Sequence, residues 1–377
     1  MFTASCDDSI TNPVDVPITV TESELKEAFY YTFPLMIMDA TESVETNAET
    51  FVPGIPRAPI NQLIHAVKMA DASNKSVVTP NVDTYYSRLW MDMNEEPVVF
   101  EFPDVKDRFC NVQVLDAWTN TTKLITDGGT YVFAKKGQTK VSVPSGVTLV
   151  EMPTTMGWCI VRILNKGEGD YENVKKIQDA MKAYPLSAYG NAEYVAPKGT
   201  YDAAKDVNPV MKCLSMPLDE YFAKANSLME KNSPLSFDTE IINRLKKLGV
   251  GPGLHLKQIE NGAEMFAKIK ASFKADAVAI AATNKRNIGG IWSYFKEPIG
   301  DFGNAYDYRA AVALVGLGAN TNEIAIYPRA DYDSNNEPLN GANSYTLHFS
   351  SLLPVEEGGF WSITAYGDDN YLNDNPI

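Results

Sequence analysis

The chain has 377 residues, carries a net charge of −15 at neutral pH and is 45% hydrophobic. This length exceeds what one hydrophobic core usually organises, so we expect two domains, and the composition is that of a globular protein. The acidic balance, without any Lys- and Arg-rich run, excludes a nucleic-acid partner. No apolar stretch approaches the roughly 18 residues of a transmembrane helix, so we expect no membrane-spanning segment.

Residues 1–20 are expected to form a tail or tether. Small residues at positions 3–5 directly precede Cys6, as at the end of a bacterial lipoprotein signal, but the basic and apolar parts of an export signal are missing before them. Two interpretations stay open. Cys6 is either the lipidation site of an exported protein that begins further upstream, or a cysteine in a disordered tail.

Residues 21–195 are predicted to form the first domain. Thr21 and Glu24 have capping-box spacing and predict a helix that Pro34 ends or kinks. A second helix is predicted at 61–70. Short β-rich runs then recur about every ten residues, with Gly- and Pro-containing turns between them, which predicts an antiparallel sandwich or jelly roll. These predicted strands are 98–102, 109–115, 119–125, 130–134, 140–143, 148–151 and 158–163, followed by a helix capped by Asp170.

Residues 196–300 are predicted to be a helical region, and residues 301–377 to open a second domain. A linker rich in Gly, Pro, Asn and Asp is expected at 196–215. The predicted helices are 218–231, 238–248, 258–282 and 306–317, and the predicted later strands are 323–327, 344–349 and 360–365. The expected fold class is therefore α+β, mainly β, with two jelly-roll-like antiparallel sandwiches around a helical region and the second sandwich incomplete.

Motifs at both ends of the chain carry a family resemblance. Residues 80–87 read Pro-Asn-Val-Asp-Thr-Tyr-Tyr-Ser and residues 184–187 read Tyr-Pro-Leu-Ser. Tyr-Arg-Ala follows at 308–310, Leu-Asn-Gly at 339–341 and Asn-Pro-Ile at 375–377. The chain resembles the family that joins domains of unknown function 1254 and 1214. The resemblance implies two jelly-roll-like sandwiches in an exported, envelope-associated and oligomeric protein, and it implies no particular activity.

Chains of that family continue past the Asn-Pro-Ile element with further strands. We therefore expect this sequence to be a fragment or one half of a split pair. Its second sandwich would then have unpaired edges and an uncovered apolar face around Phe360 and Trp361.

The densest group of candidate ligand-binding residues follows Asn81. Strand alternation would place Asp83 and Tyr85 on one face and Tyr86 and Arg88 on the other. An amide, a carboxylate and phenols this close together suit a polar ligand or a sugar. Alternatively, the side chains of Asn81 and Asp83 hold a turn while the aromatic rings pack. Both interpretations stay open.

Other candidates are scattered along the chain. Asp116 and Trp118 suit carbohydrate stacking and hydrogen bonding, or belong to a half-buried strand. His65 precedes the Asn81 segment and matches a position of the family. Arg309 suits a bidentate carboxylate clamp, or pairs with a nearby acid such as Asp307. The three histidines have no metal-ligand spacing, so we expect no metal site and no cofactor.

Two functions are compatible with these residues. The leading hypothesis is a cell-envelope binding or assembly protein, exported to the periplasm or anchored there as a lipoprotein, that forms a homo-oligomer and holds a small polar or carbohydrate ligand. The alternative is an enzyme acting on such a substrate at Asn81, Asp83 and Tyr85, with Asp83 or Asp116 as acid or base and Tyr85 or Arg88 holding negative charge. An enzyme site requires these groups to converge in a cleft, whereas an assembly protein requires an extended apolar patch. Whether Cys110 and Cys159 form a disulfide is also left open.

Overall fold

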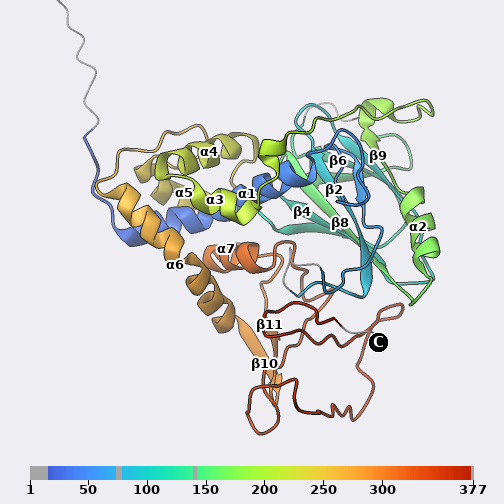
Figure 1. Cartoon of the computed structure of the whole chain (residues 1–377). Coiled ribbons are helices and arrows are strands. Elements are labelled where there is room, and N and C mark those ends of the chain that lie inside the picture. The colour runs from blue at the N-terminus through green and yellow to red at the C-terminus, as the bar shows by residue number, and fades with distance from the viewer. Residues whose placement is uncertain (1–15, 74–78, 139–141, 375–377) are drawn as a thin grey trace, which may run out of the picture.

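The structure, a computed structural model, describes residues 16–73, 79–138 and 142–374. Two β-sheets lie face to face in one half of the molecule, and helices fill the other half (Figure 1). The five-stranded sheet contains, in spatial order, β1 (Leu63–His65), β2 (Thr84–Asp92), β8 (Met156–Leu164), β4 (Cys110–Asp116) and β5 (Thr121–Ile125). The four-stranded sheet contains β7 (Thr148–Met152), β6 (Gly129–Lys135), β3 (Val98–Phe102) and β9 (Lys182–Pro185).

The space between the two sheets is one hydrophobic core. Alternate residues of each strand point into it, as the pleat of a strand requires, among them Leu89, Val112, Phe133 and Val161. Neighbouring strands are antiparallel except β6 and β7, which run parallel. Helix α2 (Tyr171–Ala180) packs at the side of this sandwich through Val174. The predicted α+β class is confirmed, but the expectation of a mainly β chain is not, because the described residues form more helix than strand.

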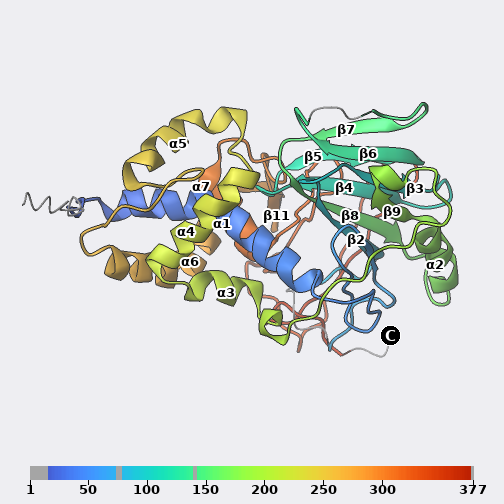
Figure 2. The same ribbon diagram turned by 90° about the horizontal axis from the view of Figure 1, so that it is seen from above.

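The helices form a second core around α1 (Glu22–Glu45), which runs through the middle of the helical half toward the sheets (Figure 2). Its predicted capping box is present: Glu24 N donates to Thr21 Oγ1 at 3.2 Å, and Thr21 N donates to Glu24 Oε2 at 2.8 Å. The neighbouring helices are α3 (Pro209–Ser215), α4 (Leu218–Lys231), α5 (Thr239–Leu245), α6 (Gly262–Thr283) and α7 (Tyr306–Val315). In the described part of the chain, no helix is both long and apolar enough to cross a membrane.

One prediction about the N-terminal part is wrong and another is narrowed. Pro34 does not end helix α1, which continues through it to Glu45, because the apolar residues on both sides of the proline are buried and outweigh its missing hydrogen bond. The predicted helix at 61–70 is instead strand β1, which pairs with β2 so that His65 lies opposite Ser87. A partner distant in sequence overrides the local helical spacing there. Half of the predicted strand at 140–143 lies outside the described residues, and residues 142–143 form no strand.

The C-terminal part differs most from expectation. A hairpin of β10 (Lys285–Gly289) and β11 (Trp292–Phe295) follows α6, but the predicted strands at 323–327, 344–349 and 360–365 do not form. Within the described residues beyond 296, the only β pairing is in isolated bridges. A strand needs a neighbour to pair its backbone groups, and these segments have none. Their apolar side chains consequently stay exposed, with Leu347 44% and Ile363 59% exposed.

Arg108 and Asp170 form a buried ion pair that ties the segment just before β4 to the start of α2. Asp170 does not cap α2; its carboxylate accepts hydrogen bonds from Arg108 Nη1 at 2.5 Å and Nη2 at 3.2 Å. Burial alone would raise the pKa of Asp170, but hydrogen bonds from Arg108, the backbone of Lys166 and Asn173 lower it to about 2.

We predict that Asp170→Asn lowers the free energy of unfolding by roughly 3 kcal/mol, because it removes the buried counter-charge of the Arg108 guanidinium and leaves only the exposed carboxylate of Asp107. The matched control is Asp107→Asn, which removes a carboxylate that binds the same arginine but is 59% exposed, and which should cost less than about 1 kcal/mol. Urea unfolding at pH 7 measures both. Since the folded pKa is depressed, the contribution of Asp170 is present above about pH 4 and lost as the pH falls toward 2. Equal losses in the two variants would contradict this account.

Candidate functional site

The outer face of the five-stranded sheet, which points away from the sandwich core, is divided into an apolar and a polar end. At the apolar end, Trp90, Trp158 and Ile160 pack against the helical core. At the other end the same strands carry polar side chains. Tyr86 of β2 and Asn111 of β4 both lie opposite Arg162 of β8, which puts the arginine in the middle of a row of three. We call this end, made of Thr84, Tyr86, Asn111, Gln113 and Arg162, the polar face.

Arg162 is held in place from several sides. Its Nη1 donates to Gln113 Oε1 at 2.8 Å, its Nη2 donates to the carbonyl oxygen of Gly318 at 3.1 Å, and its guanidinium lies 5.5 Å from the centre of the Tyr86 ring. Gly318 belongs to the loop after α7 and has a φ of +80°. A Cβ atom there would approach Ile160 Cδ1 to 2.8 Å, so only glycine lets the loop come this close to the sheet.

Several atoms of the polar face are buried without a hydrogen-bond partner. They are Thr84 Oγ1, Asn111 Nδ2, Asn111 Oδ1 and Arg162 Nε, together with Oδ1 of the nearby Asn320, and none of them bonds to any residue that the structure describes. All four side chains are at least nine-tenths buried. Buried polar groups in proteins are nearly always paired, and each unpaired one costs about 1–3 kcal/mol. Their gathering in one place indicates a site for a polar molecule.

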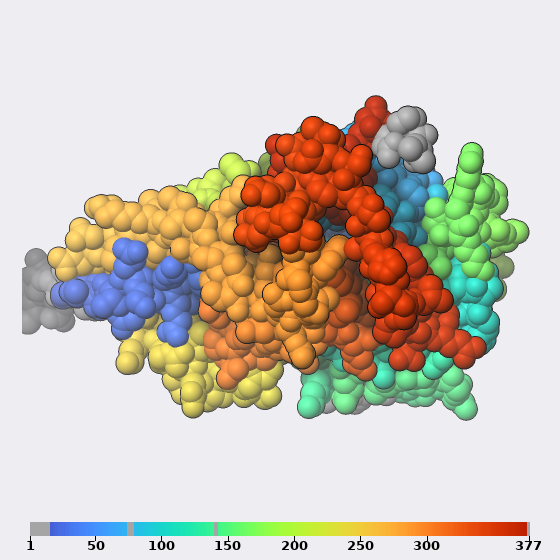
Figure 3. Space-filling view, turned by 90° about the horizontal axis from the view of Figure 1, so that it is seen from below, coloured from blue at the N-terminus to red at the C-terminus, as the bar shows by residue number. Residues whose placement is uncertain are grey.

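The described chain at 321–374, which we call the C-terminal segment, covers the polar face. Ser362 Oγ donates to Asp83 Oδ2 at 2.7 Å, Tyr366 Oη donates to the carbonyl oxygen of Pro80 at 3.0 Å, and the Phe360 ring meets that of Phe109 at 5.5 Å. Figure 3 shows this segment, coloured orange to red, running across the surface of the molecule. The site therefore lies between the sheet and a loosely packed stretch of chain.

Tyr327 is the part of this segment that reaches toward Arg162. The residue is 58% exposed, but its hydroxyl accepts a hydrogen bond from Asn320 Nδ2 at 3.0 Å. Burial raises the pKa of this hydroxyl, the charge of Arg162 lowers it, and Tyr86 and Asp83 raise it. The hydroxyl end of Tyr327 thus shares the surroundings of the polar face while the rest of the residue faces solvent.

A second cluster surrounds Arg309 on α7. The side chain is fully buried, and its guanidinium lies 5.4 Å from the ring of Tyr31, 5.3 Å from Trp118 and 5.2 Å from Tyr306. Its three nitrogens make no hydrogen bond to the described residues. The hydroxyls of Tyr31 and Tyr306 donate to Asp238 at 2.9 and 3.0 Å. We call Arg309 and the three rings the aromatic cage; it fills its own space and joins α1, α7 and the turn after β4.

Asp116 lies beside the aromatic cage in the turn after β4. Its Oδ1 accepts from the backbone N–H groups of Trp118 and Asn120, both at 2.9 Å. Burial raises the pKa of this carboxyl to about 6, although the bonds from Asn120, the charge of Arg309 and the bond from Trp118 lower it. Three of the predicted residues, Asp116, Trp118 and Arg309, therefore come together here.

The remaining predicted residues are separated. Asn81 holds a turn, since its Oδ1 accepts from the backbone N–H of Asp83 at 2.7 Å and of Thr84 at 3.0 Å. Tyr85 points into the sandwich core, on the opposite side of the sheet from Tyr86. Arg88 pairs with Glu45 at 2.8 Å.

His65 and the cysteines also lie in structural positions, with His65 partly buried and Cys110 and Cys159 buried. His65 Nδ1 lies 2.8 Å from Ser87 Oγ, and burial lowers the pKa of the imidazole to about 4. Cys110 and Cys159 are free thiols on the inner face of the sheet, and Cys110 has its pKa raised by burial to about 12. Cys6 lies outside the described residues. Within the described ranges, no group of three or more His, Cys, Asp or Glu side chains is placed to hold a metal ion.

Sequence reasoning missed Arg162, Asn111, Gln113 and Asn320. A signal for the first three was present. Asn111 and Gln113 alternate with apolar residues through 110–116, and Arg162 is the single charge in the apolar run 158–163. Because β4 and β8 are covered on both faces, each polar residue in them requires a partner.

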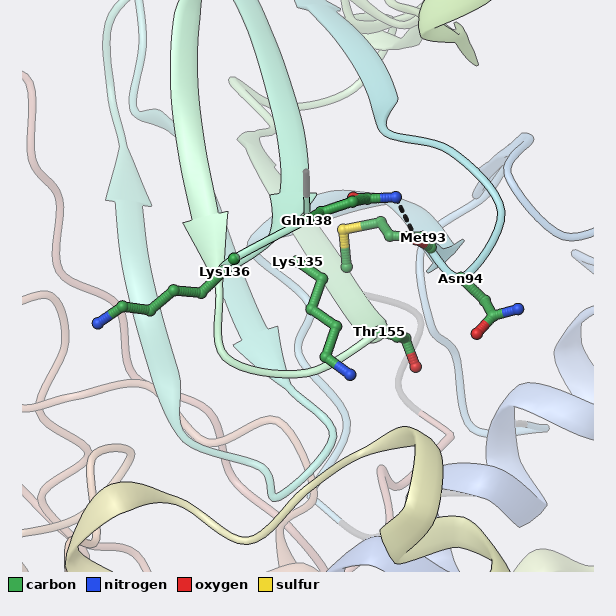
Figure 4. Close-up of a pocket in the computed structure, with 7 residues that line it drawn as sticks. Met93, Asn94, Lys135, Lys136, Gln138 and Thr155 are labelled. Carbon is green, nitrogen blue, oxygen red and sulfur yellow. Dashed lines mark hydrogen bonds between the residues drawn. The ribbon is translucent and has the colours of Figure 1, made fainter. Parts of the chain in front are cut away.

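A surface pocket of about 260 Å³ lies at the end of the sandwich near Lys135 and Gln138 (Figure 4). Lys135 Nζ donates to the carbonyl oxygen of Lys231 at 3.2 Å, and Thr155 Oγ1 donates to Asn232 Oδ1 at 3.1 Å. The lysine thus binds the C-terminal end of α4, where a positive charge is favourable. We interpret this pocket as a joint between sheet and helix.

We predict that Asp116→Asn removes the loss of folding stability that ionisation of this buried carboxyl causes as the pH rises. The folded pKa of about 6 lies above the ordinary value of 3.8, so wild-type stability falls as the pH rises from about 4 to above 6. The stability of the variant relative to wild type should therefore improve by roughly 3 kcal/mol over that range, at about 1.4 kcal/mol per pKa unit. Urea unfolding at pH 4 and pH 7.5 measures the difference, and a difference that does not change with pH would contradict it.

Comparison with known families matches two models to this chain. The model described as "Protein of unknown function (DUF1254)" matches residues 60–185, and that described as "Protein of unknown function (DUF1214)" matches residues 324–377. Comparison with curated protein sequences found no match. Among solved structures, the crystal structure of the VPA0106 protein from Vibrio parahaemolyticus is similar, with a TM-score of 0.58 and 19% identity over 85% of this chain and 73% of that chain. This likeness shows the fold alone.

Proposed function

We propose that this chain is a binding module for a small polar ligand. The chain belongs to the family that combines domains of unknown function 1254 and 1214. The ligand would lie between the polar face and the C-terminal segment. The observation that carries this proposal is the group of buried polar atoms on Thr84, Asn111, Arg162 and Asn320 that bond to none of the described residues. The site joins the first matched domain to the second, and junctions of this kind commonly hold ligands.

Binding is favoured over catalysis by the chemistry of the residues present. The groups of Asn81, Asp83 and Tyr85 do not converge: Asn81 holds a turn, Tyr85 faces the sandwich core, and Asp83 accepts from Ser362 at the rim of the polar face. Around Arg162, the described side chains are amides, hydroxyls and phenols. Such groups orient a ligand but are poor acids and bases near neutral pH.

The cellular setting is a further part of the proposal. We place the protein in the cell envelope, as a lipoprotein anchored through Cys6 and assembled as a homo-oligomer, with residues 301–377 contributing to a second jelly-roll-like sandwich. The family resemblance and the small residues before Cys6 support this placement. Expressed with its upstream coding sequence, the protein should incorporate labelled palmitate, and Cys6→Ser should not. Equal labelling of the two, or recovery of both without label, would contradict the anchor.

We predict that Asn111→Leu makes the ligand-free protein more stable, by roughly 1–2 kcal/mol, because it replaces a buried unpaired amide by an apolar group of similar size. The same variant should lose any small molecule that native mass spectrometry detects on the freshly purified parent. Thermal and urea unfolding measure the first effect.

The matched control is Asn226→Leu. Asn226 is equally buried, but its amide makes three hydrogen bonds, to Gly249, Leu254 and Gly251, at 2.8–2.9 Å. This variant should lose roughly 3 kcal/mol, about 1 kcal/mol for each bond. If Asn111→Leu destabilises the protein as much as Asn226→Leu does, the amide of Asn111 is already satisfied in the fold and the proposal fails.

A further inference from the structure

The polar face offers unpaired donors and unpaired acceptors at the same time. Arg162 Nε and Asn111 Nδ2 are donors, Asn111 Oδ1 and Asn320 Oδ1 are acceptors, and the hydroxyl of Thr84 is both. A simple anion would satisfy only the donors, and a simple cation only the acceptors. Hydroxyl groups satisfy both kinds, so the pattern favours a ligand that carries several of them.

The charge of the polar face favours a negative group on the same ligand. The two Nη atoms of Arg162 bond to neutral partners, Gln113 Oε1 and the carbonyl oxygen of Gly318. Among the described residues, no carboxylate lies within ion-pair distance of this guanidinium. A buried cation without a counter-charge is costly, and neutral dipoles offset that cost only in part. A carboxylate at Nε would supply the missing charge.

Aromatic side chains and the C-terminal segment border the polar face. The Tyr86 ring lies beside Arg162, and the hydroxyl of Tyr327 reaches into the same surroundings. Such rings accept the C–H faces of a sugar-like ring. The bonds from Ser362 to Asp83 and from Tyr366 to Pro80 hold the C-terminal segment at the edge of the polar face.

We infer that the ligand is a small polyhydroxylated carboxylate, with the chemistry of a sugar acid. Its carboxylate accepts from Arg162 Nε, and its hydroxyls bond to Asn111, Thr84 and Asn320. This inference rests on the proposed function and specifies its ligand class. It gives the two residues separate roles: Asn111 binds hydroxyl groups of the ligand, and Arg162 binds its carboxylate.

Isothermal titration calorimetry with three probes of similar size tests the inference. Galacturonate has the ring, the hydroxyls and the carboxylate; galactose lacks the carboxylate; cyclohexanecarboxylate lacks the hydroxyls. We expect galacturonate to bind the parent protein about 10- to 100-fold more tightly than galactose, the factor that one charge-assisted hydrogen bond is worth. A preference of similar size over cyclohexanecarboxylate is expected from the loss of two or more neutral hydrogen bonds. Arg162→Gln should abolish this preference over galactose. Arg244→Gln, which removes an exposed arginine paired with Glu27, should leave it unchanged.

A milder variant keeps the test valid if Arg162→Gln fails to fold. Thr84→Val retains the shape of the side chain and removes only the hydroxyl, so it should fold and should bind galacturonate about 5- to 10-fold more weakly, as expected for one neutral hydrogen bond. Unchanged galacturonate affinity in Thr84→Val would contradict the assignment of ligand hydroxyls to this residue.

The outcomes separate this inference from the proposed function. Equal affinity for galactose and galacturonate would contradict the claim that Arg162 binds a carboxylate of the ligand. Equal affinity for cyclohexanecarboxylate and galacturonate would contradict the claim that the site binds hydroxyl groups. If none of the three probes binds while Asn111→Leu still stabilises the protein and releases a co-purified molecule, the ligand class is wrong and the binding module stands. If Asn111→Leu behaves like Asn226→Leu, the proposed function fails as well.

Discussion

The site depends on the burial of Arg309 inside its aromatic cage. Three rings from α1, the turn after β4 and α7 itself surround the guanidinium at 5.2–5.4 Å. A buried arginine with unpaired nitrogens is tolerated because the rings and the nearby carboxylates Asp116 and Asp238 offset its charge. The cage fixes α7 against both the helical core and the sheet. The position of α7 therefore sets where the following loop begins.

The polar face inherits its geometry from this fixed helix. The loop that leaves α7 passes over the sheet at Gly318, and the carbonyl oxygens of Gly318 and Ala319 accept from Arg162 and Gln113. These bonds orient two side chains and leave Arg162 Nε, together with both ends of the Asn111 amide, free of partners among the described residues. The loop after α7 thus orients Gln113 and the two Nη atoms of Arg162, while Arg162 Nε and the Asn111 amide stay available to a ligand. Buried polar groups that are kept this way lower stability, and a bound ligand would offset that cost.

The elements that could be predicted from the sequence are those fixed by local chemistry. The capping box of Thr21 and Glu24 starts α1 as predicted, and α4 and β3 have the predicted bounds of 218–231 and 98–102, because hydrophobic spacing and turn residues specify them. The resemblance to the joined 1254 and 1214 domains is confirmed by both family models. Strand β1 could not be predicted, since its spacing is that of a helix and only β2 makes it a strand.

The candidate site could be predicted only in part, for the same reason. Tyr86 and Arg309 were picked out because the sequence around them is dense in polar and aromatic groups. Arg162 and Asn111 are isolated in apolar strands, and only the pairing of β4 with β8 places them opposite each other. Long-range register decides which polar residues meet, and a single sequence carries no direct signal of register.

The most direct test of the account is a high-resolution experimental density map of the protein purified without stringent washing. We predict continuous density for a small molecule on the polar face, within hydrogen-bond distance of Arg162 Nε and of the side-chain amide of Asn111. A map in which Asn111, Thr84 and Asn320 bond to one another or to the C-terminal segment, with no molecule between them, would contradict the central claim that this face is a binding site.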